Sequence, residues 1–599
     1  MKFVALCVLP IVVAAWFSVG FLVLQAAGVL QKSRRDLILC CLTGFGLIGM
    51  VIAGLGFLQL WYTSILIVLI MMSAASGLFG AYRYGYGVWR AAPWRWPIRC
   101  SWVEYAGLFF LLIYGICALL PPTGIDELMY HLSVPRLYFE HHGFYNIIWN
   151  QQANLPMLAE MNYALGMVFE NHILCRLIAY CASALCVLMV AVVGKTAIKS
   201  RTYLWLAALI FLSHTNTIAN FNECNVDLIN AAFILAAFWF VSRWKQAPST
   251  GVAFMAALML GFVLQSKAFG ILCLPVALAA MVVPLRKVSR AQVLQIVLMI
   301  GLPLLCGLIW YAKSHLYQGV AIVGMNALAA VVAPTAAGSQ SVVDQVLQLL
   351  MQAGSNIIAA PWSYSLLPVL HRMDSFGPLF LGILPFMLLI KNKRPMGMML
   401  FWGCALWLLF IVLSTMHGGM SIRYLSATVA LFSIGTAYVI EQVDSHAIRR
   451  FLLVWVIAAV GLNLAMTLKR YRVELISVLK GESWHEYLMK NYLPYPALDF
   501  INTQTPSDAR VAAPYCFGTY YINRPYEAFD RSYADSAELI DECHKRGISY
   551  LLANDVLDTN TNRFAFFAGA GLELVFGENS FRAYKVPCPK TAASSPAAP

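Results

Sequence analysis

Residues 172–201 read HILCRLIAYCASALCVLMVAVVGKTAIKSR, and this stretch contains the pattern that decides the fold. Residues 172–194 are almost wholly apolar, and a helix of about 20 apolar residues is long enough to cross the hydrocarbon core of a bilayer. Lys195, Lys199 and Arg201 follow at once, as in the positively charged cytoplasmic loops of membrane proteins. The stretch therefore predicts a membrane span that ends at the cytoplasm.

Similar apolar runs recur along the whole chain. The length criterion predicts fourteen transmembrane helices, near residues 4–30, 36–58, 62–80, 102–120, 172–194, 203–219, 226–242, 250–265, 268–285, 293–315, 376–391, 397–415, 424–440 and 450–467. The first run resembles a signal peptide, but it is too long and lacks a clear cleavage site. We interpret it as a retained helix, and we expect an α-helical polytopic membrane protein.

The basic residues give this chain an orientation. Seven clusters of Lys and Arg lie between alternate predicted spans, at residues 32–35, 83–99, 195–201, 243–245, 286–290, 391–394 and 449–450. Because Lys and Arg collect in cytoplasmic loops, these segments are predicted to be cytoplasmic. We therefore expect a multi-pass protein of the bacterial inner membrane whose C-terminal part lies in the periplasm.

The composition agrees with this class. Hydrophobic residues make up 60% of the 599 residues and charged residues 12%, whereas an ordinary soluble domain is about a quarter charged. The net charge of +13 would suggest nucleic acid if the basic residues formed one face. They lie in short loop clusters instead, so the expected partner is membrane lipid and not nucleic acid.

The predicted topology leaves three long segments on the external side of the membrane. We divide the chain into additional N-terminal transmembrane helices (1–100), a transmembrane catalytic domain (101–467) with external loops 121–171 and 317–375, a periplasmic α/β domain (468–590) and a disordered tail (591–599). Two surface helices are expected near 126–140 and 154–169. The α/β domain is predicted to contain strands at 510–515 and 548–554, a helix at 535–546, and a hairpin of 572–576 with 581–586.

The cysteines indicate neither a zinc site nor a redox motif. The chain has 15 of them, mostly within apolar runs, where they act as small apolar side chains. No CxxC pair and no Cys/His zinc spacing is present. A disulfide among Cys516, Cys543 and Cys588 in the polar C-terminal part is left open.

The strongest candidate for a functional site lies in the first external segment, at Asp126-Glu127-Leu128-Met129-Tyr130-His131. On a helix, Glu127 and His131 would share one face. A carboxylate here can act as a general base toward an acceptor hydroxyl or help to hold a divalent cation. It can equally cap the helix that follows. The residues alone leave these alternatives open.

Several short motifs resemble the GT-C superfamily of integral membrane glycosyltransferases, in particular the bacterial branch related to protein O-mannosyltransferases and aminoarabinose transferases (glycosyltransferase family 39-like). They span about residues 101–586, and their order and side of the membrane carry the resemblance. They comprise Gly124-Ile125-Asp126-Glu127, the aromatic segment Tyr130 to Tyr145, Asn154-Leu155-Pro156, Arg176, Asn225-Val226-Asp227-Leu228, Ser266-Lys267-Ala268, and Arg423-Tyr424-Leu425. The three spans before residue 101 are an addition to the usual plan.

The resemblance implies a GT-C-like bundle that transfers a sugar from a polyprenyl-phosphate donor to a hydroxyl of a lipid, glycan or protein acceptor. It places the catalytic base, or a metal-site residue, at Asp126, with Glu127 as the second candidate. Tyr130 and His131 are implied substrate-binding residues. A divalent metal ion is an implied cofactor, and no ligand set is identified for it. The identity of the sugar, hexose or pentose, stays open.

Two cationic side chains are candidates for binding the phosphate of the donor. Lys267 and Arg423 lie at predicted external ends of spans, and a charge near hydrocarbon usually has a partner or a task. The alternative is that both side chains snorkel to the interface. Asp227 either contacts acceptor or metal, or caps the span that begins there.

Other classes of function remain as alternatives. A transporter or lipid flippase would also have many spans, but it predicts inverted repeats, and none is visible in the sequence. A glycan ligase or polymerase outside the GT-C fold would share both donor and compartment, and a binding or scaffold protein would lack a carboxylate–cation pair in its pocket. The sequence contains no Walker A loop, dinucleotide fingerprint or GxSxG elbow.

Overall fold

The computed structural model describes residues 1–77, 101–282, 289–318, 376–416, 421–513, 518–528, 536–554, 571–578 and 580–587, with a few residues between 80 and 87 and between 351 and 365. The predicted external loop beyond residue 318, the tail 591–599, Cys516 and Cys588 lie outside the described residues. The chain forms two compact units. Unit 1 comprises Met1–Leu120, Tyr138–Asn146 and Asn154–Leu479, and unit 2 comprises Pro121–Leu137, Ile147–Ala153 and Lys480–Pro599.

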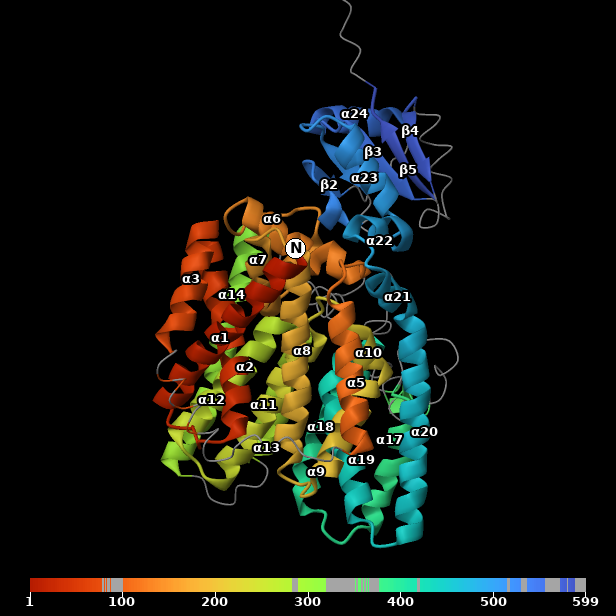
Figure 1. The fold of residues 1–599 in the computed structure, drawn as a ribbon. Coiled ribbons are helices and arrows are strands. Elements are labelled where there is room, and N and C mark those ends of the chain that lie inside the picture. The colour runs from red at the N-terminus through yellow and green to blue at the C-terminus, as the bar shows by residue number, and fades with distance from the viewer. Residues whose placement is uncertain are drawn as a thin grey trace, which may run out of the picture. The chain divides into compact units, whose positions relative to one another are not determined.

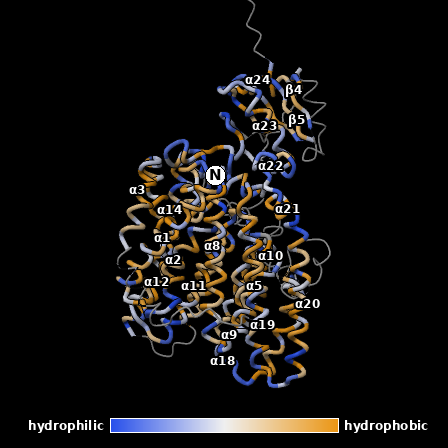
Figure 2. The backbone as a smooth tube through the Cα atoms, in the orientation of Figure 1, coloured by the Kyte–Doolittle hydropathy of each residue, from blue (hydrophilic) through white to orange (hydrophobic). Residues whose placement is uncertain are grey.

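Unit 1 is a bundle of apolar helices (Figures 1 and 2). Among the described residues, eight helices are long and apolar enough to cross a membrane, and six further apolar helices are shorter. Each predicted span overlaps one of these helices, so the chain is a multi-pass membrane protein. Because six helices are shorter than a full span, the number of crossings stays a prediction.

The helices of unit 1 follow one another in this order. They are α1 (Lys2–Ala26), α2 (Arg34–Phe57), α3 (Thr63–Ser76), α5 (Trp102–Cys117), α7 (Leu158–Met167), α8 (His172–Gly194), α9 (Arg201–Ser213), α10 (Thr215–Phe221), α11 (Asp227–Gln246), α12 (Thr250–Ser266), η3 (Ala268–Leu272), α13 (Cys273–Val282), α14 (Arg290–Gln318), α17 (Pro378–Ile383), η5 (Leu384–Leu389), α18 (Arg394–Met416), η6 (Ile422–Leu425), α19 (Ser426–Gln442) and α20 (His446–Arg470).

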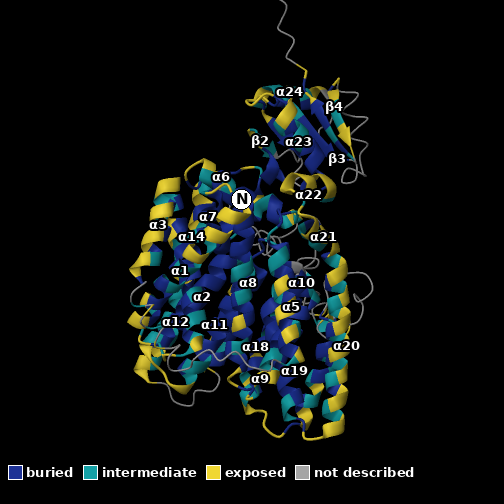
Figure 3. Ribbon diagram, in the orientation of Figure 1, coloured by how far each residue is buried: buried dark blue, intermediate teal, exposed yellow. Residues whose placement is uncertain are grey.

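Burial separates the central helices of the bundle from the peripheral ones (Figure 3). In the most apolar part of α11 and of the η6–α19 segment, 89% of the residues are buried inside the protein. In α20 the buried share is 22%, and many of its exposed residues are apolar. Apolar side chains on an outer helix face are stable only against lipid. The bundle therefore surrounds α11 and α19, and α20 presents one face to the bilayer.

The additional N-terminal helices are packed into unit 1 through small residues. A Cβ atom on Gly20 would collide with the carbonyl of Cys40, and a Cβ atom on Gly44 with the carbonyl of Trp16, so α1 and α2 pack with their backbones in close approach. Trp16 Nε1 donates to Asn162 Oδ1 of α7 at 3.1 Å. These contacts make the first helices an integral part of the bundle.

The same N-terminal helices hold a short part of the first external loop. The Phe144 N–H donates to the Gly56 carbonyl at 2.9 Å, and Gln59 Nε2 donates to the Phe144 carbonyl at 2.6 Å. From the other side, Lys313 of α14 lies 5.2 Å from the centre of the Phe144 ring. The loop segment 138–146 is therefore fixed to unit 1 by main-chain hydrogen bonds.

Unit 2 contains the small α/β fold predicted for the C-terminal part. Its described elements are η1 (Glu127–His131), α22 (Trp484–Asn491), α23 (Tyr495–Gln504), β1 (Val511–Ala513), η8 (Thr519–Tyr521), β2 (Tyr526–Ala528), α24 (Ser536–Arg546), β3 (Tyr550–Asn554), β4 (Glu573–Glu578) and β5 (Phe581–Lys585). α6 (Ser133–Glu140) and η2 (Gln151–Asn154) have residues in both units, and α21 (Arg472–Lys480) ends at the first residue of unit 2.

The five strands of unit 2 form one mixed sheet with the order β2-β1-β3-β5-β4. β1 runs parallel to β2 and β3, with Val511 opposite Tyr526 and Tyr550. β5 pairs antiparallel with β3 and β4. The short strand β2 was absent from the sequence prediction, since three residues are too few to show an alternating pattern.

Cys543 belongs to the core of unit 2. It is completely buried beside Leu539, Ile548 and Leu551, and it is a free cysteine. Burial raises the pKa of its thiol to about 12, so the reactive thiolate is scarce at neutral pH. The structure therefore does not support a disulfide bond at Cys543.

We predict that Gly44→Ala lowers the thermal stability of the detergent-solubilised protein. The new methyl group must separate α1 from α2, and overpacking of this kind costs about 1–3 kcal/mol. Gly54→Ala on the same helix is the matched control, since nothing lies within 4 Å of its Cβ position. Equal unfolding temperatures for the two variants would contradict the close approach of α1 and α2.

Candidate functional site

Three charged residues from distant parts of the sequence meet within unit 1. Asp227 is the first residue of α11, Lys267 follows the last residue of α12, and Arg423 lies in η6. The α12 helix ends at Lys267 because the backbone there is extended, with φ −158° and ψ 137°. The Ser421 side chain accepts a hydrogen bond from the Arg423 N–H at 3.3 Å and so starts η6.

The centre of this group is a salt bridge between Lys267 Nζ and Asp227 Oδ1. Arg423 Nε lies 3.8 Å from the other oxygen, Oδ2, which is too far for a hydrogen bond but close enough for charge attraction. The Asp227 side chain is 3% exposed, whereas those of Lys267 and Arg423 are 16% and 27% exposed. One buried carboxylate therefore faces two partly accessible cations.

Tyr424 supplies an aromatic face to the same cations. Lys267 Nζ lies 3.8 Å and Arg423 Cζ 5.5 Å from the centre of its ring, within the range of cation–π attraction. Phe269 stacks on the Tyr424 ring with 5.0 Å between centroids. These contacts help to fix the positions of both cations.

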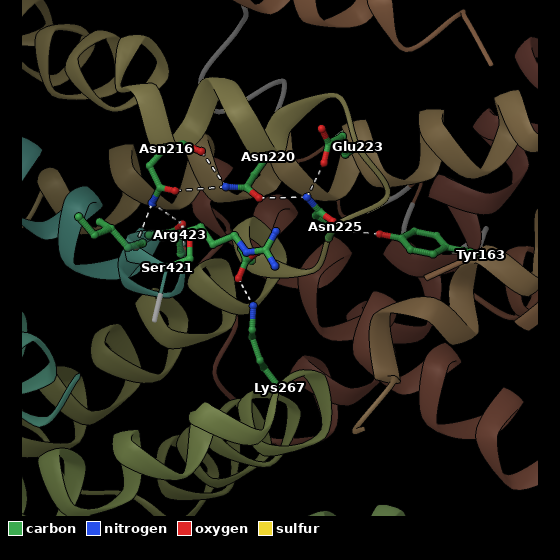
Figure 4. A network of polar contacts seen from close by, with 11 residues as sticks. Tyr163, Asn216, Asn220, Glu223, Asn225, Lys267, Ser421 and Arg423 are labelled. Carbon is green, nitrogen blue, oxygen red and sulfur yellow. Dashed lines mark hydrogen bonds and ion pairs between the residues drawn. The ribbon is translucent and has the colours of Figure 1, made fainter. Parts of the chain in front are cut away.

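A chain of asparagines supports the Arg423 segment (Figure 4). Asn216 Nδ2 donates to the Ile422 carbonyl at 3.3 Å. Asn220 Nδ2 donates to Asn216 Oδ1 at 3.2 Å, and Asn225 Nδ2 donates to Asn220 Oδ1 at 3.1 Å. The three asparagines are buried, so the chain links the turn before α11 to the segment that carries Arg423.

Two arginines fix the turn that leads into Asp227. Arg176 Nε donates to the Asn222 carbonyl and Arg176 Nη1 to the Leu120 carbonyl, both at 2.9 Å. Arg470 Nη2 pairs with Glu223 at 3.3 Å, and Glu223 also accepts from Asn225 Nδ2 at 2.8 Å. The bidentate geometry of a guanidinium suits this anchoring. Arg176, singled out by its motif, therefore has a structural role here.

A cavity opens beside the salt bridge. It offers about 30 Å³ to water-sized molecules, which is enough for one or two of them. Its wall is mostly apolar or aromatic, with Lys267, Asn230 and Thr428 as polar members. The lining residues are Asn230, Ile234, Lys267, Phe269, Leu272, Cys273, Leu406, Phe410, Tyr424, Leu425, Ala427 and Thr428.

The chemistry available to this site is the binding of an anion beside an apolar wall. Partly exposed Lys and Arg side chains suit phosphate, and the apolar wall beside them suits a hydrocarbon group. The Asp227 carboxylate turns toward Lys267, and the N-cap of α11 is Val226, so Asp227 contributes an ion pair and not a helix cap.

The acidic segment 126–131 belongs to unit 2. Asp126 is half-buried and precedes the π-helical turn η1 without capping it through its side chain. Glu127 is fully buried and accepts a hydrogen bond from the Gly124 N–H at 3.3 Å. His131 is buried, and its ring contacts that of Tyr130 with 4.1 Å between centroids. Asp126 is thus the more accessible acid.

Residues 518–523 of the C-terminal domain pack on this acidic segment. Tyr521 Oη donates to the Pro122 carbonyl at 2.7 Å. Arg136 donates to the Tyr520 carbonyl, and its Nη2 contacts Asn523 Oδ1 at 3.3 Å. Gly518 has φ +62°, and a Cβ atom there would collide with Tyr492 Oη and lie 3.0 Å from Leu128 Cβ. The acidic segment and the C-terminal domain therefore form one packed unit.

The structure thus brings together Asp227, Lys267 and Arg423, and separately Asp126, Glu127, Tyr130 and His131. Sequence reasoning missed Tyr424 as a cation contact, and it missed the asparagine chain. The available signal was the density of asparagine in residues 214–230, HTNTIANFNECNVDLIN. Among the described residues, no group of three or more His, Cys, Asp or Glu is arranged to hold a metal ion.

Comparisons with known proteins give matches at the level of structure. No protein-family model and no curated protein matches the chain. Two solved structures of ArnT from Cupriavidus metallidurans, one in the apo state and one bound to undecaprenyl phosphate, match with a TM-score of 0.49 and 13% identity, over 81% and 82% of this chain and 98% of theirs. The archaeal oligosaccharyltransferase AglB from Archaeoglobus fulgidus, in complex with an inhibitory peptide and a dolichol-phosphate, matches with a TM-score of 0.39 and 12% identity, over 82% of this chain and 76% of that one. No residue is assigned a role from these similarities.

We predict that Gly518→Ala loosens the acidic segment. The methyl group collides with Tyr492 Oη and crowds Leu128, and the positive φ adds strain of about 1 kcal/mol. Amide hydrogen exchange at residues 122–132 should become faster. Gly547→Ala is the control, because Gly547 also has a positive φ of 67° but nothing within 4 Å. Equally fast exchange in both variants would show that the close packing of Gly518 against Tyr492 and Leu128 does not hold the acidic segment.

Proposed function

We propose that the protein is a GT-C-like membrane glycosyltransferase that moves a sugar from a polyprenyl-phosphate donor to an acceptor hydroxyl on the periplasmic face of the inner membrane. The observation that carries the proposal is the pair of partly exposed cations, Lys267 and Arg423, held by Asp227 and Tyr424 beside an apolar cavity. This combination matches a ligand with an anionic head and a hydrocarbon tail.

Electrostatics explains why such a pair favours a lipid phosphate. A glycosyl phosphodiester carries one negative charge, and the sugar-free phosphate that leaves carries nearly two. The positive charges of Lys267 and Arg423 therefore stabilise the leaving group more than the bound donor. Catalysis requires this kind of interaction, stronger in the transition state than in the ground state.

In the proposed reaction, Asp126 removes the proton of an acceptor hydroxyl. The acceptor oxygen forms a bond with the anomeric carbon while the bond from that carbon to the phosphate oxygen breaks. The electron pair of the broken bond stays on the phosphate, which leaves as polyprenyl phosphate beside Lys267 and Arg423. A single displacement inverts the anomeric centre. Asp126 is preferred to Glu127 as the base because Glu127 is fully buried.

We expect Asp126→Asn to lower the transfer rate by a factor of about 100 or more, since general-base catalysis typically contributes 10²–10⁴-fold. The measurement is release of sugar-free carrier from glycosylated prenyl phosphates in proteoliposomes that contain the acceptor extract. Glu140→Gln, at an exposed acid of the same external loop, is the control. Unchanged transfer by the Asp126→Asn variant would remove Asp126 from the mechanism.

The same assay separates the enzyme from a flippase. A flippase would move the glycosylated lipid across the vesicle membrane with the bond between sugar and phosphate intact. Appearance of sugar-free carrier that depends on the wild-type protein therefore supports transfer. Translocation without bond cleavage would contradict it.

We also expect Lys267→Gln and Arg423→Gln each to weaken binding of a bare C20 prenyl phosphate by about 10-fold or more, because hydrogen bonds to charged groups contribute about 1.5–3 kcal/mol. Binding is measured by isothermal titration in nanodiscs. The control is Lys391→Gln, a cation whose salt bridge to Asp444 is fully exposed at 2.9 Å. Wild-type affinity in both cavity variants would rule out this phosphate site.

A further inference from the structure

Two neutral polar side chains line the cavity beside Lys267, and binding of a phosphate gives them no role. Asn230 lies one turn beyond Asp227 on α11, and Thr428 lies in the first turn of α19. Both side chains line the cavity. Asn230 is 6% exposed and Thr428 is fully buried. Within the described part of the chain, Asn230 Oδ1 and Thr428 Oγ1 have no hydrogen-bond partner.

Such unpaired groups are costly inside a protein. A buried polar atom without a partner costs about 1–3 kcal/mol, and helical Ser and Thr hydroxyls commonly avoid this by bonding to the carbonyl four residues earlier. Ser433 on the same helix does so, donating to the Val429 carbonyl at 2.7 Å. Thr428 makes no such bond among the described residues. A carboxamide oxygen and a hydroxyl that both lack hydrogen-bond partners in one cavity indicate a ligand that supplies these partners.

The chemistry of the two groups selects the kind of ligand. A carboxamide offers one acceptor and two donors, and a hydroxyl can donate and accept. A phosphodiester oxygen only accepts, so it cannot satisfy Asn230 Oδ1. A sugar hydroxyl both donates and accepts, and the space of about 30 Å³ is close to the size of one such group.

We propose that Asn230 and Thr428 bind a hydroxyl of the glycosyl group of the donor, while Lys267 and Arg423 hold its phosphate. This inference rests on the proposed function and adds a determinant of sugar recognition to it. The ligand class is a neutral, hydroxyl-bearing pentose or hexose joined to a prenyl phosphate.

The test compares two ligands on the same variants. Dissociation constants are measured in nanodiscs for a bare C20 prenyl phosphate and for its mannosyl and arabinosyl phosphodiesters, and the sugar that the wild type prefers is used. Thr428→Val and Asn230→Leu should each weaken binding of the glycosylated ligand by about 3- to 10-fold. Binding of the bare phosphate should stay within about 2-fold of the wild type.

Two further variants serve as controls. Thr428→Ser keeps the hydroxyl and should restore the preference for the glycosylated ligand. Thr436→Val removes another fully buried hydroxyl of α19 that has no partner among the described residues, but Thr436 does not line the cavity. It should bind both ligands like the wild type, which separates a local contact from a general effect on α19.

Equal weakening of both ligands would show that the two groups contact the phosphate and would overturn the inference. Unchanged binding of both would show that only water completes them and would overturn it as well. A wild-type protein that binds neither ligand would refute the proposed function itself. A wild type that binds bare phosphate without any preference for a sugar would refute only this inference.

Discussion

The salt bridge between Lys267 and Asp227 is the interaction on which the rest of the site depends. Each charge alone would be expensive next to the hydrocarbon region, and removal of one partner from a buried pair costs about 3–5 kcal/mol. The pair is stable because α12 ends at Lys267 where α11 begins at Asp227. The second cation, Arg423, can then approach the same carboxylate at 3.8 Å and add a second positive charge to the site.

Keeping that geometry requires a rigid polar frame within an apolar bundle. The asparagine chain from Asn216 to Asn225, together with Arg176 and Arg470, makes hydrogen bonds and an ion pair with main-chain and side-chain groups around the turn before α11. Hydrogen-bond networks in a medium of low dielectric constant favour a unique arrangement. Asn230 and Thr428 each have a side-chain oxygen without a partner among the described residues, and both line the cavity, where a ligand can supply the partner.

The N-terminal helices add a second constraint. They pack on one another through Gly20 and Gly44, and they fix the main chain at Phe144 of the first external loop. The residues before and after this loop segment belong to unit 2, where Tyr521 and Arg136 hold the acidic segment. Residues of the first external loop therefore form hydrogen bonds with parts of the chain that are distant in sequence.

The sequence by itself determined the membrane class, the approximate positions of the apolar helices and most strands of the small domain. Hydropathy and the alternation of basic clusters are local properties, and the cost of exposing apolar or charged groups in the wrong medium makes them decisive. It also identified Asp227, Lys267 and Arg423 as charged residues at span ends. The folded structure was needed to show that these three residues meet, that Tyr424 and the asparagines support them, and that the segment around Asp126 packs against residues 518–523. Contacts between residues 40 or more positions apart depend on how helices pack, and that packing is set by side-chain shape over the whole bundle.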